Sequence, residues 1–242
     1  MKFFEIKLTN ALANLTVYLP DFSKEMPQSA VKPGVLVIPG GGYSFCSDRE
    51  AEPVALAFAG KGYAAFVLRY TIGTEYDFSM PFADVNEAMK IIHDNAQEWN
   101  VDKNRIAAIG FSAGGHLCAA VSTMGDIRPN ASILVYPCIV EEISEILAFP
   151  VPGLDEKVDA ETPPAFIVAA CEDNLVPIKN SLAYASALDK ANIPFEMHIY
   201  EKGYHGFSLA DENVYSKAEA DYCAHIRGWF DLCIKWLEKR YE

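Results

Sequence analysis

The hydroxyl of Ser112 is the group in this sequence with the clearest capacity for chemistry, because it lies in Gly110-Phe-Ser-Ala-Gly114. An apolar run at residues 105–109 predicts a buried strand before this segment, and residues 117–121 predict the start of a helix after it. A strand, then Gly-x-Ser-x-Gly, then a helix is the context of a nucleophile elbow, a strained turn that exposes the serine hydroxyl. The same sequence pattern also occurs in ordinary glycine-rich turns, so a catalytic role for Ser112 depends on whether a base and an acid are available to it.

A serine hydroxyl is a weak nucleophile until a histidine removes its proton. His205 is the best candidate, because it follows a predicted strand and lies in Gly203-Tyr-His-Gly-Phe207, where glycines allow an unusual backbone path. Structural roles are expected for the histidines that fall within helices or strands, or on the same helix entrance as Ser112: His93, His116, His198 and His225.

The imidazole of such a pair is held in the right tautomer by a carboxylate. Glu172 and Asp173 follow the strand predicted at residues 165–170, and both lie between Ser112 and His205 in the chain. Acids elsewhere in that interval fall on helices, within strands or in an irregular acidic segment. Placement alone leaves Glu172 and Asp173 as alternatives.

Backbone N–H groups must also stabilise the charge that develops on the substrate oxygen. The N–H of Ala113, directly after Ser112, is one expected donor. Gly40-Gly41-Gly42 follows an apolar run at residues 34–38, and residues without side chains let the backbone approach a substrate closely. The glycine run and Ala113 therefore predict an oxyanion hole.

The elements that position these residues alternate along the chain. Apolar runs bounded by turn residues predict strands buried on both faces of a sheet, at residues 34–38, 64–68, 105–109, 131–135 and 165–170. Other strands are predicted at residues 3–8, 15–19 and 195–200, and helices at about residues 48–59, 82–99, 178–191 and 216–239. The alternation predicts one α/β domain, residues 1–242, with a mostly parallel sheet and helices on both faces.

The composition indicates a globular chain with an acidic balance. Apolar residues make up 51% of the 242 residues, and the formal net charge is −13. This charge repels nucleic-acid backbones and anionic membranes, so neither partner is expected. The N-terminus lacks the apolar core of a signal peptide and no run could span a bilayer, which predicts a cytoplasmic protein. The six cysteines have no metal-binding spacing and are expected to be reduced.

Residues 137–164 form the longest irregular stretch and carry five prolines and a cluster of acids. Loops of this length often act as lids or binding loops, and a solvated acidic excursion is the alternative. The sequence leaves both interpretations open. It also leaves open the oligomeric state, including whether the chain forms a homodimer.

Together these segments resemble the α/β-hydrolase esterases and lipases, including hormone-sensitive-lipase-like carboxylesterases and bacterial acetyl-xylan or sugar-ester esterases. The resemblance covers nearly the whole chain, at Pro39-Gly-Gly-Gly-Tyr43 with Ser47-Asp-Arg-Glu50, Val101-Asp-Lys-Asn-Arg-Ile106, Gly110-Phe-Ser-Ala-Gly-Gly-His116, Glu172-Asp173 with Val176-Pro177, and Gly203-Tyr-His-Gly-Phe207. It implies Ser112 as nucleophile, His205 as base, Asp173 as the orienting acid, and an oxyanion hole of Gly41, Gly42 and Ala113. It implies no metal or organic cofactor.

Two departures from the lipase branch stand out. Pro39 occupies the position where that branch often has a histidine, so the hydrogen bonds of the missing side chain must come from elsewhere. The long N-terminal segment that helps to form a cap is also absent, which implies little or no cap domain and small or polar substrates.

The resemblance implies hydrolysis of short acyl esters, acetyl in particular, of sugars or xylo-oligosaccharides through an acyl-enzyme. Tyr43 and Tyr204 lie beside the glycine run and the histidine, where rings can stack on a sugar, although core packing is the commoner use of such residues. The alternatives are a prolyl-oligopeptidase-type serine peptidase and a non-catalytic binding module of hydrolase fold.

Overall fold

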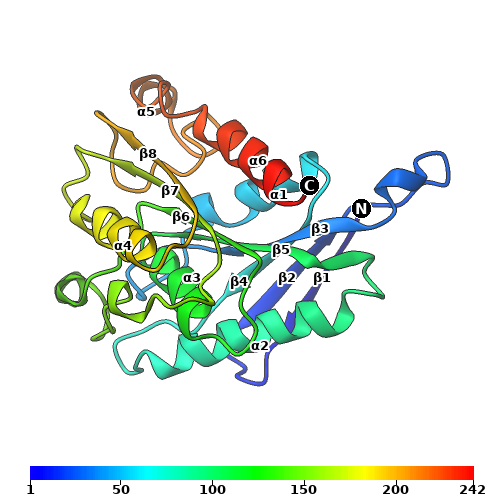
Figure 1. Cartoon of the computed structure of the whole chain (residues 1–242), viewed down its shortest axis with the longest axis horizontal. Coiled ribbons are helices and arrows are strands. Elements are labelled where there is room, and N and C mark those ends of the chain that lie inside the picture. The colour runs from blue at the N-terminus through cyan, green and yellow to red at the C-terminus, as the bar shows by residue number, and fades with distance from the viewer.

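Eight strands form one sheet in the computed structural model, in the order β1-β2-β4-β3-β5-β6-β7-β8 (Figure 1). The structure describes residues 1–242, apart from the side chain of Gln28. The pairs β1–β2 and β2–β4 are antiparallel, and all later pairs are parallel. The strands are β1 (Lys2–Lys7), β2 (Asn14–Leu19), β3 (Lys32–Ile38), β4 (Ala64–Arg69), β5 (Val101–Phe111), β6 (Ala131–Val135), β7 (Ala165–Ala170) and β8 (Phe195–Tyr200).

Helices cover both faces of this sheet (Figure 1). One face packs against α2, α3 and α4, and the opposite face packs against α1 and α6. The α-helices are α1 (Glu52–Gly60), α2 (Ser79–Asn95), α3 (Ala113–Met124), α4 (Lys179–Lys190), α5 (Lys217–Tyr222) and α6 (Trp229–Arg240). The predicted α/β class, with a mostly parallel sheet between two helical layers, is confirmed.

Strand β3 shows why the central strands read as continuous apolar runs. Leu36 and Ile38 belong to the core between the sheet and α2, α3 and α4, whereas Val35 and Val37 belong to the core on the opposite face. All four side chains are fully buried. Successive strand residues point to opposite faces, so a strand covered on both sides must be apolar at every position.

The parallel register brings the carboxyl ends of the strands to one edge of the sheet. Ile38 of β3 lies opposite Gly110 of β5, and Ala170 of β7 lies opposite Tyr200 of β8. The segments that leave these strands carry the glycine run, Ser112, Glu172-Asp173 and the His205 loop. They therefore emerge along the same edge, where open α/β sheets bind ligands.

The C-terminal helix predicted at residues 216–239 is wrong in one respect, because the chain forms two helices there. Between α5 and α6 the backbone makes tight turns, with the N–H of Ile226 donating to Cys223 O at 2.9 Å and that of Trp229 to Ile226 O at 2.8 Å. The guanidinium of Arg227 donates to the carbonyls of Ala210 and Ala220. These bonds to carbonyls compete with a continuous helical ladder.

Part of the irregular segment at residues 137–164 packs into the core. Phe149, Val151 and Leu154 are buried there, and two short 3₁₀ helices span Glu141–Ile146 and Asp155–Lys157. The N–H of Ala148 donates to Gly42 O at 2.9 Å. The segment is thus anchored to the glycine run and is not a wholly solvated excursion.

Within the described residues, no helix has both the length and the apolar character that a membrane span requires.

Candidate active site

Ser112 occupies a tight turn between β5 and α3. Its backbone has φ of 53° and ψ of −119°, a conformation that costs energy for a residue with a side chain. A Cβ at Gly110 would come 2.1 Å from Gly114 O, and a Cβ at Gly114 would come 2.2 Å from Ile38 O. Both positions therefore require glycine for steric reasons. The turn has the geometry that the Gly-x-Ser-x-Gly pattern predicts for a nucleophile elbow.

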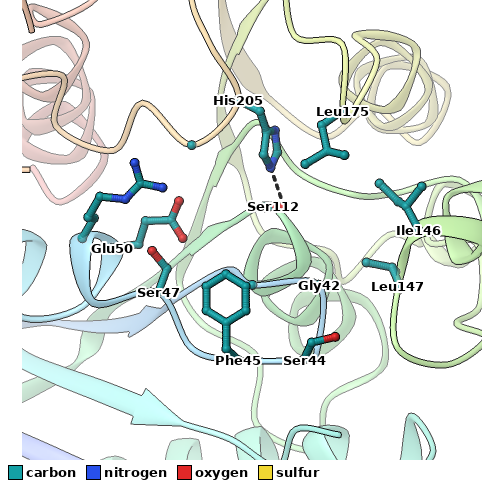
Figure 2. Close-up of a pocket in the computed structure, with 13 residues that line it drawn as sticks. Gly42, Ser44, Phe45, Ser47, Glu50, Ser112, Ile146, Leu147, Leu175 and His205 are labelled. Atoms are coloured by element: carbon teal, nitrogen blue, oxygen red, sulfur yellow. Dashed lines mark hydrogen bonds between the residues drawn. The ribbon is translucent and has the colours of Figure 1, made fainter. Parts of the chain in front are cut away.

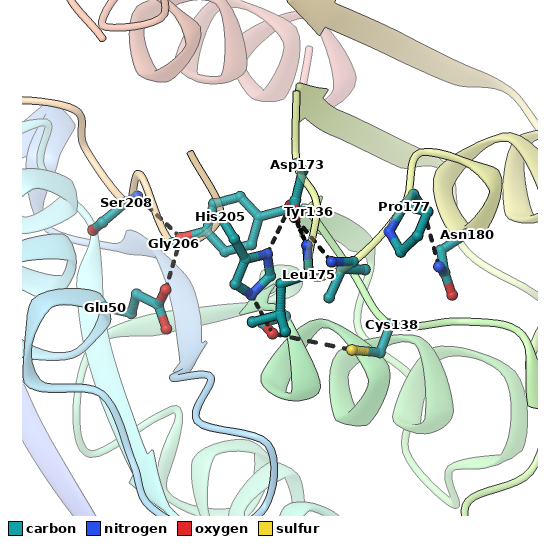
Figure 3. Close-up of polar contacts among 12 residues, drawn as sticks. Glu50, Tyr136, Cys138, Asp173, Leu175, Pro177, Asn180, His205, Gly206 and Ser208 are labelled. Atoms are coloured by element: carbon teal, nitrogen blue, oxygen red, sulfur yellow. Dashed lines mark hydrogen bonds and ion pairs between the residues drawn. The ribbon is translucent and has the colours of Figure 1, made fainter. Parts of the chain in front are cut away.

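His205 and Asp173 meet Ser112 in a hydrogen-bonded chain. The Nε2 atom of His205 lies 2.8 Å from Ser112 Oγ, and Nδ1 lies 2.7 Å from Asp173 Oδ2 (Figures 2 and 3). A carboxylate accepts hydrogen bonds, so the neutral imidazole carries its proton on Nδ1 and leaves Nε2 to accept from the serine hydroxyl. This tautomer is the one that a general base needs.

The carboxylate of Asp173 is itself held in place. It is 5% exposed, and its Oδ1 accepts hydrogen bonds from the N–H groups of Leu175 (3.0 Å) and Val176 (2.8 Å). The sequence left Glu172 as an alternative, but that carboxylate accepts from the hydroxyl of Tyr222 and the N–H of Gly203. The structure therefore brings Asp173, not Glu172, to the imidazole.

The predicted oxyanion glycines line the cavity in front of Ser112. Gly41 and Gly42 have positive φ angles of 129° and 63°, and a Cβ at Gly41 would come 2.0 Å from Phe45 O. Ala113 is the first residue of α3, where N–H groups have no intrahelical acceptor and the helix dipole is positive. Within the described residues, the N–H groups of Gly41, Gly42 and Ala113 donate no hydrogen bond.

Glu50 is a buried carboxylate in this site that the sequence analysis did not single out as functional. It is 3% exposed; Oε2 accepts from the N–H of Gly40 at 2.8 Å, and Oε1 accepts from the hydroxyl of Tyr136 at 2.7 Å. The Tyr136 hydroxyl also accepts from the N–H of Ser208 (Figure 3). Burial raises the pKa of Glu50, and the bonds from Tyr136 and Gly40 oppose that rise.

These contacts join the glycine run to the His205 loop. The Tyr136 ring lies edge-on to the imidazole of His205, with 5.0 Å between ring centroids. Gly40 is held by Glu50, and Pro39 O accepts from the hydroxyl of Tyr70 at 2.7 Å. Hydrogen bonds to Glu50 and Tyr70 therefore hold the loop at Pro39, where the lipase branch that the sequence resembles often has a histidine. The only sequence signal for a role of Glu50 was its place at the end of Ser47-Asp-Arg-Glu50, a segment that carries the family resemblance.

The structure does not place Tyr43 where it can contact a substrate. Its side chain is fully buried and its hydroxyl lies 2.9 Å from His116 Nδ1. The Nε2 atom of His116 lies 2.9 Å from Pro152 O, which can only accept, so Nε2 carries the proton and Nδ1 accepts from Tyr43. Burial lowers the pKa of His116 to about 4. Tyr43 thus links the backbone directly after Gly42 to His116 in the core.

Tyr204 also lies away from the cavity. Its ring is 47% exposed and stacks on Tyr222, with 4.6 Å between centroids and 16° between planes. It is not among the residues that line the cavity. Neither tyrosine predicted to stack on a sugar is therefore positioned to do so.

The cavity above Ser112 has a volume of about 440 Å³ and two chemically different sides. Ser47 and Glu50 lie on one side of Ser112 in Figure 2, with the ring of Phe45 beside Ser47. The opposite side is apolar and consists of Ile146, Leu147 and Leu175 (Figure 2). An ester bound at Ser112 would therefore have one portion in polar and the other in apolar surroundings.

The described residues contain no group of three His, Cys, Asp or Glu side chains that could hold a metal ion. All six cysteines of the described chain are free thiols. The thiol of Cys138 lies 4.0 Å from Ser112 Oγ, and burial raises its pKa to about 12.

Two family models match the chain, BD-FAE over residues 15–134 and the prolyl oligopeptidase family over residues 150–234. The α/β hydrolase MGS-M1 from a Medee basin deep-sea metagenome library is 41% identical, with a TM-score of 0.91 and coverage of 99% of this chain and 98% of that one. An acetyl ester-xyloside bifunctional hydrolase from Caldicellulosiruptor lactoaceticus is 33% identical, with a TM-score of 0.79 and coverage of 94% and 88%. The chain therefore belongs to the α/β-hydrolase family.

An acetylxylan esterase from Xylanibacter ruminicola is 34% identical over 206 residues, which cover 76% of this chain. The chain spans less than half the length of the first curated relatives that it matches, 33% of one and 43% of the other. Within the family, it is similar to an acetylxylan esterase and to carboxylesterases.

Proposed function

We propose that this chain is a serine carboxylic-ester hydrolase that acts on short acyl esters, acetyl in particular, of sugars or xylo-oligosaccharides. The observation that carries this proposal is the chain of hydrogen bonds from Asp173 through His205 to Ser112 Oγ, at the base of an open cavity. A base in the correct tautomer beside a serine on a strained elbow supports acyl transfer.

Ser112 Oγ attacks the ester carbonyl while His205 Nε2 takes its proton. The carbonyl oxygen becomes negatively charged and accepts hydrogen bonds from the N–H groups of Gly41, Gly42 and Ala113. Collapse of this intermediate breaks the bond to the alcohol, which leaves with the proton from His205. A water molecule then loses a proton to His205 and attacks the acyl-enzyme, which releases the acid and restores Ser112.

The substrate class rests on the relatives and on the cavity. One relative bears the name acetylxylan esterase, and one similar solved structure is an acetyl ester-xyloside hydrolase. A cavity of about 440 Å³ with an apolar side and a polar side suits a short acyl group on a polar alcohol. The match of residues 150–234 to the prolyl oligopeptidase family supports a serine peptidase as the second candidate.

Hydrolysis of p-nitrophenyl acetate by the wild type and by Ser112→Ala tests the mechanism. We expect the variant to lose activity by at least about 10⁴-fold, because the remaining groups lack a nucleophile. Equal rates would exclude Ser112 as nucleophile and favour a binding module. A chain-length series from acetate to octanoate, with acetylated xylose, tests the substrate class. Cleavage of prolyl amides without cleavage of esters would favour the peptidase.

A further inference from the structure

We propose that Arg49 forms a subsite for a carboxylate on the alcohol portion of the ester. This proposal rests on the proposed ester hydrolysis and specifies the substrate further: the preferred alcohol carries an acidic group. The observation behind it is a guanidinium that lines the same cavity as Ser112 and His205 and forms no ion pair within the described residues.

Arg49 combines the lack of an acidic partner with a place in the wall of the cavity. Three other arginines form ion pairs with aspartates: Arg69 with Asp48, Arg105 with Asp102 and Arg128 with Asp159. Arg227 and Arg240 also form no ion pair within the described residues, but neither lines the cavity, and Arg227 donates to backbone carbonyls. The chain has a formal net charge of −13, so acidic side chains are plentiful. A cation left without one at the mouth of a reactive cavity is available to a ligand.

The Arg49 side chain is nevertheless positioned. Its guanidinium lies over the ring of Tyr215, 5.2 Å from the centroid, and the Tyr215 hydroxyl donates to Gly206 O at 2.7 Å. A Cβ at Gly206 would come 3.3 Å from Arg49 Nη2. The cation is therefore held beside the loop that carries His205. Stacking on an aromatic ring leaves the N–H edge of a guanidinium available for hydrogen bonds.

Neither of the two acidic side chains on which the charge of Arg49 acts, Glu50 and Glu219, forms an ion pair with it within the described residues. Both carboxylate oxygens of Glu50 are engaged, one by the N–H of Gly40 and the other by the hydroxyl of Tyr136, and the side chain is buried. Glu219, whose charge Arg49 also influences, accepts hydrogen bonds from the backbone and hydroxyl of Ser216. A ligand carboxylate can therefore approach the exposed edge of Arg49.

The position of Arg49 assigns this subsite to the alcohol rather than to the acyl group. His205 gives its proton to the leaving oxygen, so the alcohol must lie against the histidine loop, where Arg49 is. The acyl chain is left to the apolar side formed by Ile146, Leu147 and Leu175 (Figure 2). A carboxylate matches the planar fork of one arginine. No lysine lines the cavity to share the greater charge of a phosphate.

A pair of esters that differ by one carboxylate tests the subsite. The esters are 3-acetoxybenzoate and its methyl ester, which carry the same acetyl group on similar phenols. We expect Arg49→Gln to lower kcat/KM for 3-acetoxybenzoate about tenfold while changing that for the methyl ester less than about twofold. Arg49→Lys should give an intermediate loss, because it keeps the charge without the fork. Arg105→Gln, which removes a charge outside the cavity, should leave the ratio of the two esters at the wild-type value.

Equal losses for both esters in Arg49→Gln, or no loss for either, would overturn the subsite. So would the same change of ratio in Arg105→Gln, because the effect would then be one of overall charge. p-Nitrophenyl hydrogen succinate carries its carboxylate on the acyl group, and a selective loss with this ester would overturn the placement at the alcohol. Hydrolysis of p-nitrophenyl acetate that depends on Ser112 keeps the esterase proposal standing in each case. Absence of that hydrolysis would instead remove the proposed function itself.

Discussion

The base of the active-site cavity and its outer wall are built in opposite ways. At the base, Ser112, Asp173 and Glu50 are 7%, 5% and 3% exposed, and each makes hydrogen bonds to the protein. On the wall, Phe45 and Leu175 are 58% and 53% exposed. Groups that must meet a transition state are held before the substrate arrives, because reorganisation during the reaction would cost rate. In the proposed function, the exposed side chains of the wall contact the substrate.

Replacing the orienting carboxylate should have the largest effect on this comparison. Asp173→Asn keeps the shape of the side chain but can hydrogen-bond the wrong tautomer of His205, so we expect kcat to fall by about 10³- to 10⁴-fold. The measurement is steady-state hydrolysis of p-nitrophenyl acetate. Glu172→Gln is the matched control and should change kcat less than about twofold. Comparable losses in the two variants would mean that both acids act on the imidazole.

Glu50→Gln tests whether a residue of the base can matter without touching the reacting atoms. The amide NH₂ would face either the N–H of Gly40 or the Tyr136 hydroxyl, and one of these groups would lose its acceptor. We expect kcat to fall about 10- to 100-fold with little change in KM. Glu52→Gln, at the exposed start of α1, is the control. A loss confined to thermal stability, with normal kcat, would show that Glu50 only supports the fold.

His116 extends the comparison to pH. Its pKa is lowered from 6.5 to about 4, so the unfolded chain binds more protons than the folded chain between these values. The stability from the neutral ring is fully present above pH 6.5 and is lost as the pH falls toward 4, by about 2 kcal/mol at pH 5. Urea unfolding at pH 7 and pH 5 should show a smaller acid loss for His116→Gln than for the wild type. His93→Gln is the control and should lose as much stability between pH 7 and pH 5 as the wild type. The same loss in His116→Gln as in the wild type would contradict this prediction.

The smallest effect is expected on the wall. Leu175→Ala removes apolar surface that is already half exposed, so kcat/KM for p-nitrophenyl butyrate should fall less than about fivefold, with acetate unaffected. Leu182→Ala on α4, which is 48% exposed outside the cavity, controls for general effects. A large loss with acetate would place Leu175 among the groups that organise the base.

The sequence predicted residues that follow strands better than residues that depend on contacts across the fold. Ser112 and Asp173 come just after the apolar runs of β5 and β7, and His205 follows the edge strand β8, whose residues are exposed or half-buried. The ends of parallel strands must share an edge. Glu50 could not be recognised in the same way, because its partners Gly40 and Tyr136 leave two different strands.

One interpretation that the sequence left open and one wrong prediction have a similar origin. Tyr43 follows the glycine run, so its position along the chain allowed either a ring that stacks on a sugar or a ring in the core, and its side chain turns inward to His116. Residues 216–239 read as one helix, because the tertiary hydrogen bonds of Arg227 that accompany the break are not visible in the sequence. Local pattern locates a backbone segment, whereas the direction of a side chain depends on what packs against it.

The hydrogen bond from Ala148 to Gly42 O has a consequence for altering the choice of ester. Ile146 and Leu147, the two residues before Ala148, line the cavity. Insertions or loop grafts at these positions would pull on the glycine turn and disturb catalysis together with specificity. Point substitutions of the side chains at 146 and 147 leave that backbone bond intact. Protein engineering for longer or shorter acyl groups should therefore begin with a saturation library at these two positions and preserve the length of the loop.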